Sequence, residues 1–276
     1  MTVEQGQSAF ITGGASGIGR ALAVALACRG VHVTILDLNS DQGEEAVRLV
    51  EEEHARLSYK PSSPSAIFIR CDVTKSDELA AAFTRHHDVF GRLHICINSA
   101  GILTGAQPFH EHEEAWRKVI DLNLVAVING TCKAIQAMKD HGGLILNISS
   151  VYAYVPSLND PIYATSKAGV AMFTRSLATV GMGIRVNALC PEFVETPLFS
   201  GVPSFFLDYL RDKVGLVEME KVVAAAFSIF DDENKVGECL SVPANRPTEV
   251  WPDEESKRKN QIFKKDGSIF AAGDFD

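Results

Sequence analysis

The chain has 276 residues, of which 46% are hydrophobic and 22% are charged, a composition typical of a globular protein and not of a disordered or fibrous one. Its 35 acidic and 26 basic residues give a net charge of −9, which disfavours nucleic acid as a partner because like charges repel. The six cysteines form no C-x-x-C pair, as is usual in a reducing compartment. Because no targeting segment and no apolar stretch of about 20 residues is present, we expect a cytoplasmic protein without a membrane span.

Short apolar runs alternate with longer helical patterns along the chain. The predicted strands are 9–12, 31–37, 66–71, 93–98, 144–149, 184–189 and 238–242, and the predicted helices are 17–29, 41–57, 77–90, 113–138 and 163–180. Near-continuous apolar strands between helices are typical of a doubly wound parallel sheet covered on both faces. We therefore expect one α/β domain over residues 1–245, followed by a charged, solvated tail over residues 246–276.

A glycine-rich turn, Thr12 to Gly19, follows the first predicted strand and opens a predicted helix. Glycines there let the backbone approach a pyrophosphate, which then binds at the N-terminus of the helix. Asp37 ends the second predicted strand; a carboxylate there can accept hydrogen bonds from the ribose of NAD and would repel the 2′-phosphate of NADP. The alternatives are a plain turn and an Asp37 that only caps the next helix.

Tyr163 and Lys167 stand one helical turn apart, and Ser150 follows the strand before them. An ammonium beside a phenol lowers the phenol pKa from about 10 toward neutrality, so that the tyrosine can exchange a proton with a reacting alcohol. The same spacing also occurs by chance on helix surfaces. Its presence in one chain with the glycine-rich turn favours the functional interpretation.

Together with Asp121-Leu122-Asn123 and the segment from Asn187 to Thr196, these motifs resemble the short-chain dehydrogenase/reductase family over roughly residues 8–242. The resemblance implies a Rossmann-like dehydrogenase domain with a substrate loop at about 197–215. It also implies that Tyr163 is the general acid/base, that Lys167 holds the nicotinamide ribose, that Ser150 binds the substrate oxygen, and that Asn123 positions a water molecule.

The resemblance implies NAD as the cofactor and predicts no metal site. The residues expected to bind NAD are Gly13, Ser16, Gly17, Ile18, Gly19, Asp37, Asp72, Val73, Asn98, Ala100, Gly101, Tyr163, Lys167, Pro191, Val194 and Thr196. The chain departs from the family pattern at Ser99 and at Glu192, which replaces a glycine. Glycine permits backbone angles that glutamate resists. The Glu192 carboxylate could stabilise the nicotinamide ring or point outward.

Two segments, residues 151–158 and 197–209, should border the substrate, and both are aromatic and apolar with almost no cations. We therefore expect a lipophilic secondary alcohol or its ketone, contacted by Ser150, Tyr152, Tyr154, Phe193, Phe199 and Phe205. Alternatively, these residues fill a subunit interface, or the chain is a non-catalytic NAD-binding scaffold on the same fold. Small and apolar residues on the helices 113–138 and 163–180, which form the dimer interface in the family, predict a homodimer or homotetramer.

Overall fold

The computed structural model describes residues 2–58, 64–104 and 113–252. Their strands form one eight-stranded sheet in the order β3-β2-β1-β4-β5-β6-β7-β8. The strands β1 to β7 run parallel and β8 pairs antiparallel with β7. Their bounds are β1 Ser8–Thr12, β2 His32–Asp37, β3 Ala66–Arg70, β4 Ile95–Asn98, β5 Gly143–Ile148, β6 Ile184–Pro191, β7 Cys239–Val242 and β8 Glu249–Trp251. The predicted doubly wound, Rossmann-like fold is confirmed.

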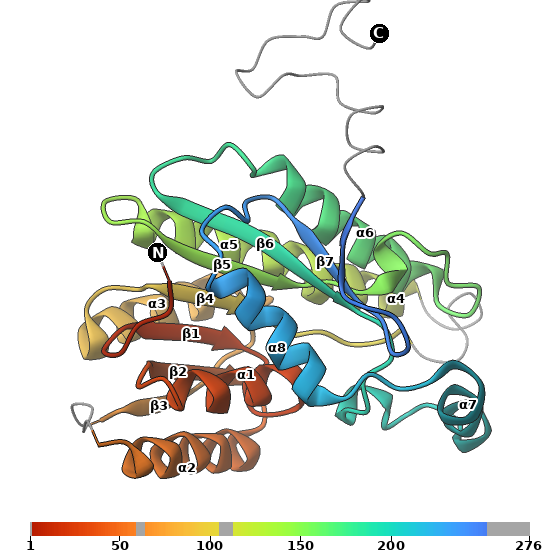
Figure 1. Cartoon of the computed structure of the whole chain (residues 1–276), viewed down its shortest axis with the longest axis horizontal. Helices are drawn as coiled ribbons and strands as arrows, with labels where there is room; N and C mark the ends of the chain where they lie inside the picture. The colour runs from red at the N-terminus through yellow and green to blue at the C-terminus, as the bar shows by residue number, and fades with distance from the viewer. Residues whose placement is uncertain (1, 59–63, 105–112, 253–276) are drawn as a thin grey trace, which may run out of the picture.

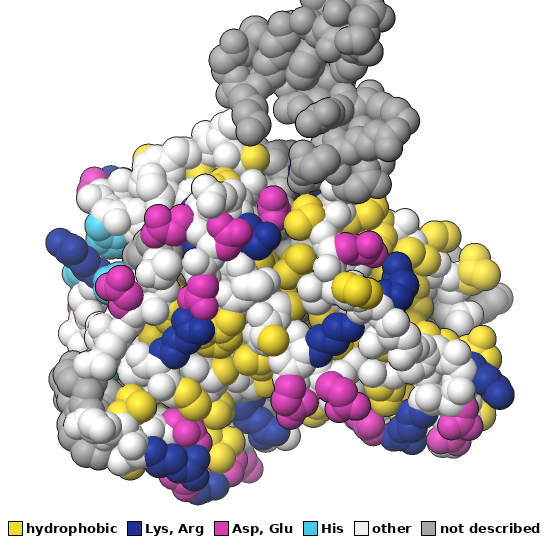
Figure 2. All heavy atoms as spheres, viewed as in Figure 1, with side chains coloured by type: hydrophobic (Ala, Val, Ile, Leu, Met, Phe, Trp, Pro, Cys, Tyr) yellow, Lys and Arg dark blue, Asp and Glu magenta, His cyan; other side chains and the backbone are white. Residues whose placement is uncertain are grey.

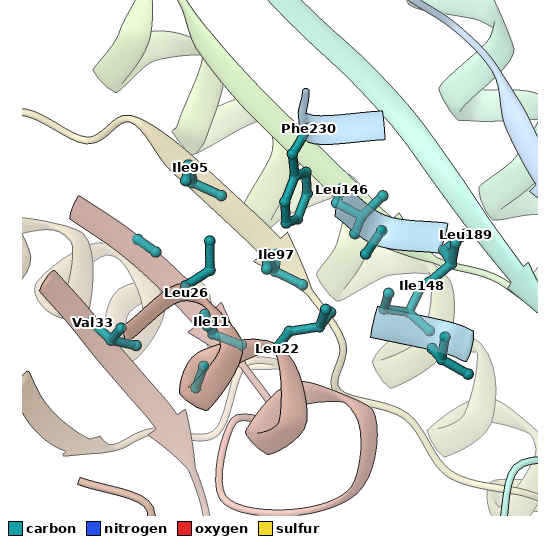
Figure 3. Close-up of a cluster of buried hydrophobic side chains, with 14 of the residues drawn as sticks. Ile11, Leu22, Leu26, Val33, Ile95, Ile97, Leu146, Ile148, Leu189 and Phe230 are labelled. Carbon is teal, nitrogen blue, oxygen red and sulfur yellow. The ribbon is translucent and has the colours of Figure 1, made fainter. Parts of the chain in front are cut away.

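Helices cover both faces of the sheet (Figure 1). One face carries α1 (Gly17–Ala27), α2 (Ser40–Arg56) and α8 (Met219–Phe230), and the other carries α3 (Ser76–Phe90), α5 (Ala126–Met138) and α6 (Pro161–Ser176). Figure 3 shows how Leu22 and Leu26 of α1 and Phe230 of α8 pack on Ile97 and Leu146 of the central strands. Because these side chains are fully buried, this apolar layer holds the carboxyl ends of the strands in fixed positions.

The predicted helix 113–138 is interrupted. It consists of α4 (Glu113–Ile120), a single π-turn (Asp121–Val125) and α5. Asn123 lies in the π-turn, and its amide binds the backbone of Ile102 on both sides, donating to the carbonyl at 2.8 Å and accepting from the N–H at 2.9 Å. A π-turn inserts one residue into the helix. Here the π-turn contains Asn123, whose side chain hydrogen-bonds the loop after β4.

The C-terminal part of the chain differs most from the predicted organisation. The strand β8 falls inside the range 246–276 that the sequence predicts to be a tail, and it completes the sheet edge. The helix α8 was not predicted, although its apolar residues recur at helical spacing. Residues 253–276 lie outside the described residues. Within the described ranges, no helix combines the length and the apolar character needed to cross a bilayer.

Candidate active site

A cavity of about 1570 Å³ opens at the carboxyl ends of the parallel strands. The sheet order reverses between β1 and β4 at this place, the usual position of a ligand in such sheets. Most of the sequence-predicted site residues line the cavity, namely Gly13, Ser16, Gly17, Ile18, Asp37, Asp72, Val73, Ala100, Gly101, Ser150, Tyr152, Tyr163, Lys167, Pro191, Phe193, Val194, Thr196, Phe199 and Phe205. Gly19, Asn98, Asn123 and Tyr154 are not part of this lining.

The glycine-rich turn between β1 and α1 is tight. Gly13 and Gly17 have positive φ angles of 63° and 51°, and a Cβ on Gly13 would lie 2.7 Å from the Cα of Ala100. Ser16 is the N-cap of α1 but makes no side-chain capping bond. The N-terminus of α1 therefore faces the cavity with the N–H groups of its first turn, which have no acceptor within the helix. This arrangement fits a bound pyrophosphate.

Two carboxylates border the same end of the cavity. Asp37 accepts hydrogen bonds from the N–H of Ala15 at 3.3 Å and of Asn39 at 3.1 Å. Asn39, not Asp37, caps α2, since its side chain accepts from the N–H of Gln42, and this excludes the capping alternative. The hydrogen bonds from Thr74 hold the pKa of Asp72 below its ordinary value. The Asp72 carboxylate is thus anionic near neutral pH.

Ser150, Tyr163 and Lys167 meet deep in the cavity. Ser150 follows β5, and its hydroxyl acts on the phenol of Tyr163 by lowering the pKa of that phenol. Tyr163 and Lys167 lie on α6, and the Lys167 ammonium is 5.5 Å from the centroid of the Tyr163 ring. The ammonium also donates to the carbonyl of Ile148 at 2.9 Å. All three residues are buried, so their polar atoms depend on one another and on the backbone.

Burial shifts the pKa values of Tyr163 and Lys167 in opposite directions. It raises the pKa of Tyr163 above its ordinary value, against the opposing effect of the Ser150 hydrogen bond, and the charge of Asp160 raises it further. Burial also lowers the pKa of Lys167 to about 8. The expectation that Lys167 brings the pKa of Tyr163 toward neutrality does not hold in this structure, because the cost of burying a phenolate is the larger effect.

Asn98 and Asn123 lie outside the cavity lining and hydrogen-bond the elements that carry lining residues. Asn98 of β4 donates to Asn147 of β5 at 2.8 Å and to Thr131 of α5 at 3.1 Å, so it joins two strands to a helix. Asn123 contacts Ile102 and, at 3.3 Å, the hydroxyl of Ser166 on α6. Neither side chain reaches the cavity lining. Both instead hold the elements that do.

The far end of the cavity is aromatic. The ring of Tyr152 meets those of Tyr163 and Phe193 edge-on, with centroids 6.2 and 5.9 Å apart. Phe199 lies in the short 3₁₀ turn Pro197–Phe199 that follows, and Phe205 lies on α7 (Ser204–Tyr209), which continues into a second π-turn (Leu210–Val214). Phe205 is 73% exposed at the rim. Figure 1 shows α7 beyond the carboxyl ends of the strands.

The structure corrects the predicted placement of Tyr154 and decides between the two orientations left open for Glu192. Tyr154 points away from the cavity, because its ring stacks on Trp251 with centroids 4.6 Å apart and its hydroxyl bonds to Ser241. Glu192 causes no backbone strain, since Met182 is the one described non-glycine residue with a positive φ. The Glu192 carboxylate lies on the cavity wall but binds the N–H of Ala244 and the side chain of Arg246.

The described residues contain no group of three or more His, Cys, Asp or Glu side chains placed to hold a metal ion. All six cysteines are free thiols. On the face shown in Figure 2, Lys and Arg side chains are interspersed with Asp and Glu side chains. This face therefore offers no continuous basic surface to a nucleic-acid backbone.

Comparisons with known proteins agree with this site. A sequence model of the short chain dehydrogenase family matches residues 7–204. The human 15-hydroxyprostaglandin dehydrogenase [NAD(+)] is 30% identical over 260 residues, covering 87% of this chain and 92% of the relative. The cis-4-hydroxycyclohexanecarboxylate dehydrogenase of Sinomonas cyclohexanicum is 38% identical over 228 residues, covering 80% and 88%.

Among solved structures, a putative short-chain alcohol dehydrogenase from Sinorhizobium meliloti 1021 superposes with a TM-score of 0.76 at 25% identity, covering 88% of this chain and 97% of that one. The chain belongs to the short-chain dehydrogenase family. Within the family, its segments 121–131 and 187–196 resemble those of the 15-hydroxyprostaglandin dehydrogenases. It is an oxidoreductase whose relatives are dehydrogenases of hydroxylated substrates.

Proposed function

We propose that this protein is an NAD-dependent dehydrogenase that interconverts a lipophilic secondary alcohol and its ketone, with Tyr163 as the general acid/base. The observation that carries the proposal is the position of the Ser150–Tyr163 hydroxyl pair. It lies in one cavity that has a glycine-rich, acidic end and an aromatic end. A nucleotide and an apolar substrate would meet at this pair.

The residues present fit the cofactor. The turn from Gly13 to Ile18 and the N-terminus of α1 would hold the pyrophosphate, Asp37 the adenosine ribose, and Lys167 the nicotinamide ribose. When bound, NAD supplies the acceptor or donor of hydride. Relatives whose names include NAD(+) support this choice.

The chain's own contribution is the placement of the alcohol oxygen and the movement of its proton. Ser150 and Tyr163 would both bind that oxygen, and Tyr163 would take its proton during oxidation or return it during reduction. Because burial raises the pKa of Tyr163, the phenol is protonated near neutral pH. The protonated phenol is the form that donates to a ketone.

We further propose that the protein is cytoplasmic and forms a homodimer or homotetramer through α5 and α6. The non-catalytic alternative, an NAD-binding scaffold, gains no support from Glu192 in place of the family glycine, because the carboxylate is turned toward Ala244 and Arg246. The observation that still favours the scaffold is the raised pKa of Tyr163. Turnover measurements separate the two functions.

The test is NADH formation from NAD⁺ with a panel of lipophilic secondary alcohols. Tyr163→Phe removes only the phenolic oxygen and should reduce turnover by a factor of about 10² to 10⁴, while NADH binds nearly as before. Tyr152→Phe, the matched control on the facing ring, should alter KM more than kcat. Near wild-type turnover by Tyr163→Phe would refute the assignment. NADH binding without turnover of any alcohol or ketone would favour the scaffold.

A further inference from the structure

Tyr154 and Glu192, two residues that the sequence connects with the cavity, both contact one C-terminal segment. This segment, residues 241–251, runs from the end of β7 through a loop into β8, and we refer to it as the C-terminal clasp. It contacts four parts of the molecule that surround the site.

Glu192 joins the clasp to the end of β6. One carboxylate oxygen accepts from the N–H of Ala244 at 2.9 Å, and the other pairs with the Arg246 guanidinium at 3.1 Å. The Glu192 side chain is 17% exposed and the Arg246 side chain 59%, so solvent screens the ion pair at its Arg246 end and the hydrogen bond from the Ala244 N–H is the better protected contact. The glycine usual at this position in the family could make neither contact.

Lys221 of α8 joins the same loop from the other side. Its ammonium donates to the backbone carbonyls of Pro243, Ala244 and Arg246. A cation with three carbonyl acceptors is a charge-assisted arrangement that holds the loop in one conformation. The loop is thus fixed between the cavity wall and α8.

Asn245 joins the clasp to the end of the substrate loop. Its amide donates to the carbonyl of Val214 at 2.9 Å. The fit is close, because a Cβ on the following Gly215, which has a φ of 92°, would lie 2.7 Å from that amide nitrogen. Movement of the clasp would therefore be transmitted to the segment that carries Phe199 and Phe205.

Tyr154 joins the clasp to the loop of Ser150. It ends the 3₁₀ turn Val151–Ala153 that begins directly after Ser150. Its hydroxyl bonds to Ser241, its ring stacks on Trp251 with 20° between the planes, and the Arg175 guanidinium lies 5.6 Å from the centroid of the Trp251 ring. The loop that presents Ser150 and Tyr152 to the cavity thus packs on β8.

We propose that the C-terminal clasp is a positioning element of the site, and that the Glu192–Arg246 pair and Asn245 are the contacts through which it acts. It holds the Ser150 loop on one side and the end of the substrate loop on the other, so it sets the affinity for the alcohol without touching it. Its kinetic consequence rests on the proposed function.

The contacts can be tested without substrate. The chain has two tryptophans, so Trp116→Phe leaves Trp251 as the single tryptophan, and acrylamide quenching of the tryptophan emission then reports whether β8 is packed against Tyr154. In this background Glu192→Ala and Arg246→Ala should each raise the quenching constant. The double variant should have a quenching constant close to that of either single variant, as expected for two residues that act through one contact. Arg246→Lys should restore most of the protection.

The hold on the substrate loop is tested by trypsin, which cleaves after Arg211 and Lys213 beside Val214. Asn245→Ala and Glu192→Ala should accelerate this cleavage and raise KM for the alcohol by about tenfold, with kcat and NADH affinity changed far less. Arg29→Ala is the matched control, because it breaks the Arg29–Asp231 ion pair at the opposite end of α8 from Lys221, and it should alter none of these quantities.

The substrate-free measurements and the kinetic measurements can each contradict the proposal independently. Unchanged quenching and unchanged cleavage in Glu192→Ala and Asn245→Ala would overturn the clasp even in an active dehydrogenase. Faster cleavage with an unchanged KM would reduce it to a purely structural element and also overturn the proposal. If no alcohol or ketone is turned over, the proposed function fails, and the cleavage rates alone decide whether the clasp holds the substrate loop.

Discussion

The carboxylate of Asp160 accepts a hydrogen bond from the backbone N–H of Tyr163, with 3.0 Å between the nitrogen and Oδ1. Its other oxygen accepts from the N–H of Thr104 at 2.8 Å. Asp160 therefore caps α6 at the turn that carries the proposed acid/base and at the same time ties this turn to the loop after β4. Displacement of that loop would displace Tyr163.

Asp160→Ser should separate these two roles. Serine is a good N-cap and keeps the bond to the Tyr163 N–H, but it is too short to hold Thr104. We expect kcat/KM to fall by roughly 10- to 100-fold, the usual effect of a misplacement of about 1 Å. Because the charge on Asp160 raises the pKa of Tyr163, its removal should also shift the pH profile of alcohol oxidation to lower pH.

The control for this variant is Arg185→Lys. Arg185 donates to the carbonyls of Ile229 and Phe230 at the end of α8, so its replacement should lower stability without moving the pH profile. An unmoved profile in Asp160→Ser, at equal or smaller loss of stability, would show that Asp160 is only a helix cap.

Asp37→Ala should relax the choice of cofactor. In the wild type we expect NADH to bind more tightly than NADPH, because the carboxylate would meet the 2′-phosphate as a like charge. The variant should narrow the ratio of the two dissociation constants by roughly tenfold, equivalent to about 1.4 kcal/mol. Fluorescence titration with both reduced cofactors measures this, and tighter NADPH binding by the wild type would contradict the role of Asp37.

The sheet and the glycine-rich end of the site were predictable because their signals are local. Strands such as β1 and β5 are near-continuous apolar runs, and the turn from Gly13 to Gly19 is recognisable from its own glycine spacing. The spacing of Tyr163 and Lys167 likewise lies within one helix. The chain order of these local signals determines the topology, because parallel strands need helical crossovers.

The errors concern residues whose role depends on a partner far away in sequence. Tyr154 carries the same apolar signal as Tyr152, and only the pairing of β7 with β8 places Trp251 against it. Glu192 could not be assigned without Ala244 and Arg246. The pKa of Tyr163 was misjudged because spacing reveals the nearby ammonium but not the degree of burial, which here is the larger effect.

The proposed dimer has a simple test. Val125 and Met172 are 51% and 56% exposed on the π-turn before α5 and on α6, where a second subunit bound through these helices would cover them. Light scattering at micromolar concentration should give at least twice the mass of the chain. Val125→Asp with Met172→Asp should yield the monomer, whereas Met182→Asp, at a comparably exposed residue in a turn before β6, should leave the mass unchanged.

The final prediction concerns acid stability and His86, which is 1% exposed at the opposite end of the sheet. Ser8 donates its single hydroxyl proton to the carbonyl of Arg92, so it accepts from Nε2–H of His86 at 3.1 Å. Nδ1 of His86 then accepts from the hydroxyl of Thr34 at 2.8 Å. The ring is held neutral, and burial lowers its pKa to about 4.

The unfolded chain binds this proton near pH 6.5 and the folded chain only near pH 4, so stability is complete above pH 6.5 and is lost as the pH falls between these values. From pH 7.5 to pH 5 this linkage should remove about 2 kcal/mol from the free energy of unfolding. His86→Gln, which keeps a donor near Ser8 but does not titrate, should lose that much less over the same interval in urea titrations. His87→Gln, at the exposed neighbour, should behave as the wild type does. An equal loss in the wild type and His86→Gln would mean that other groups carry the acid sensitivity.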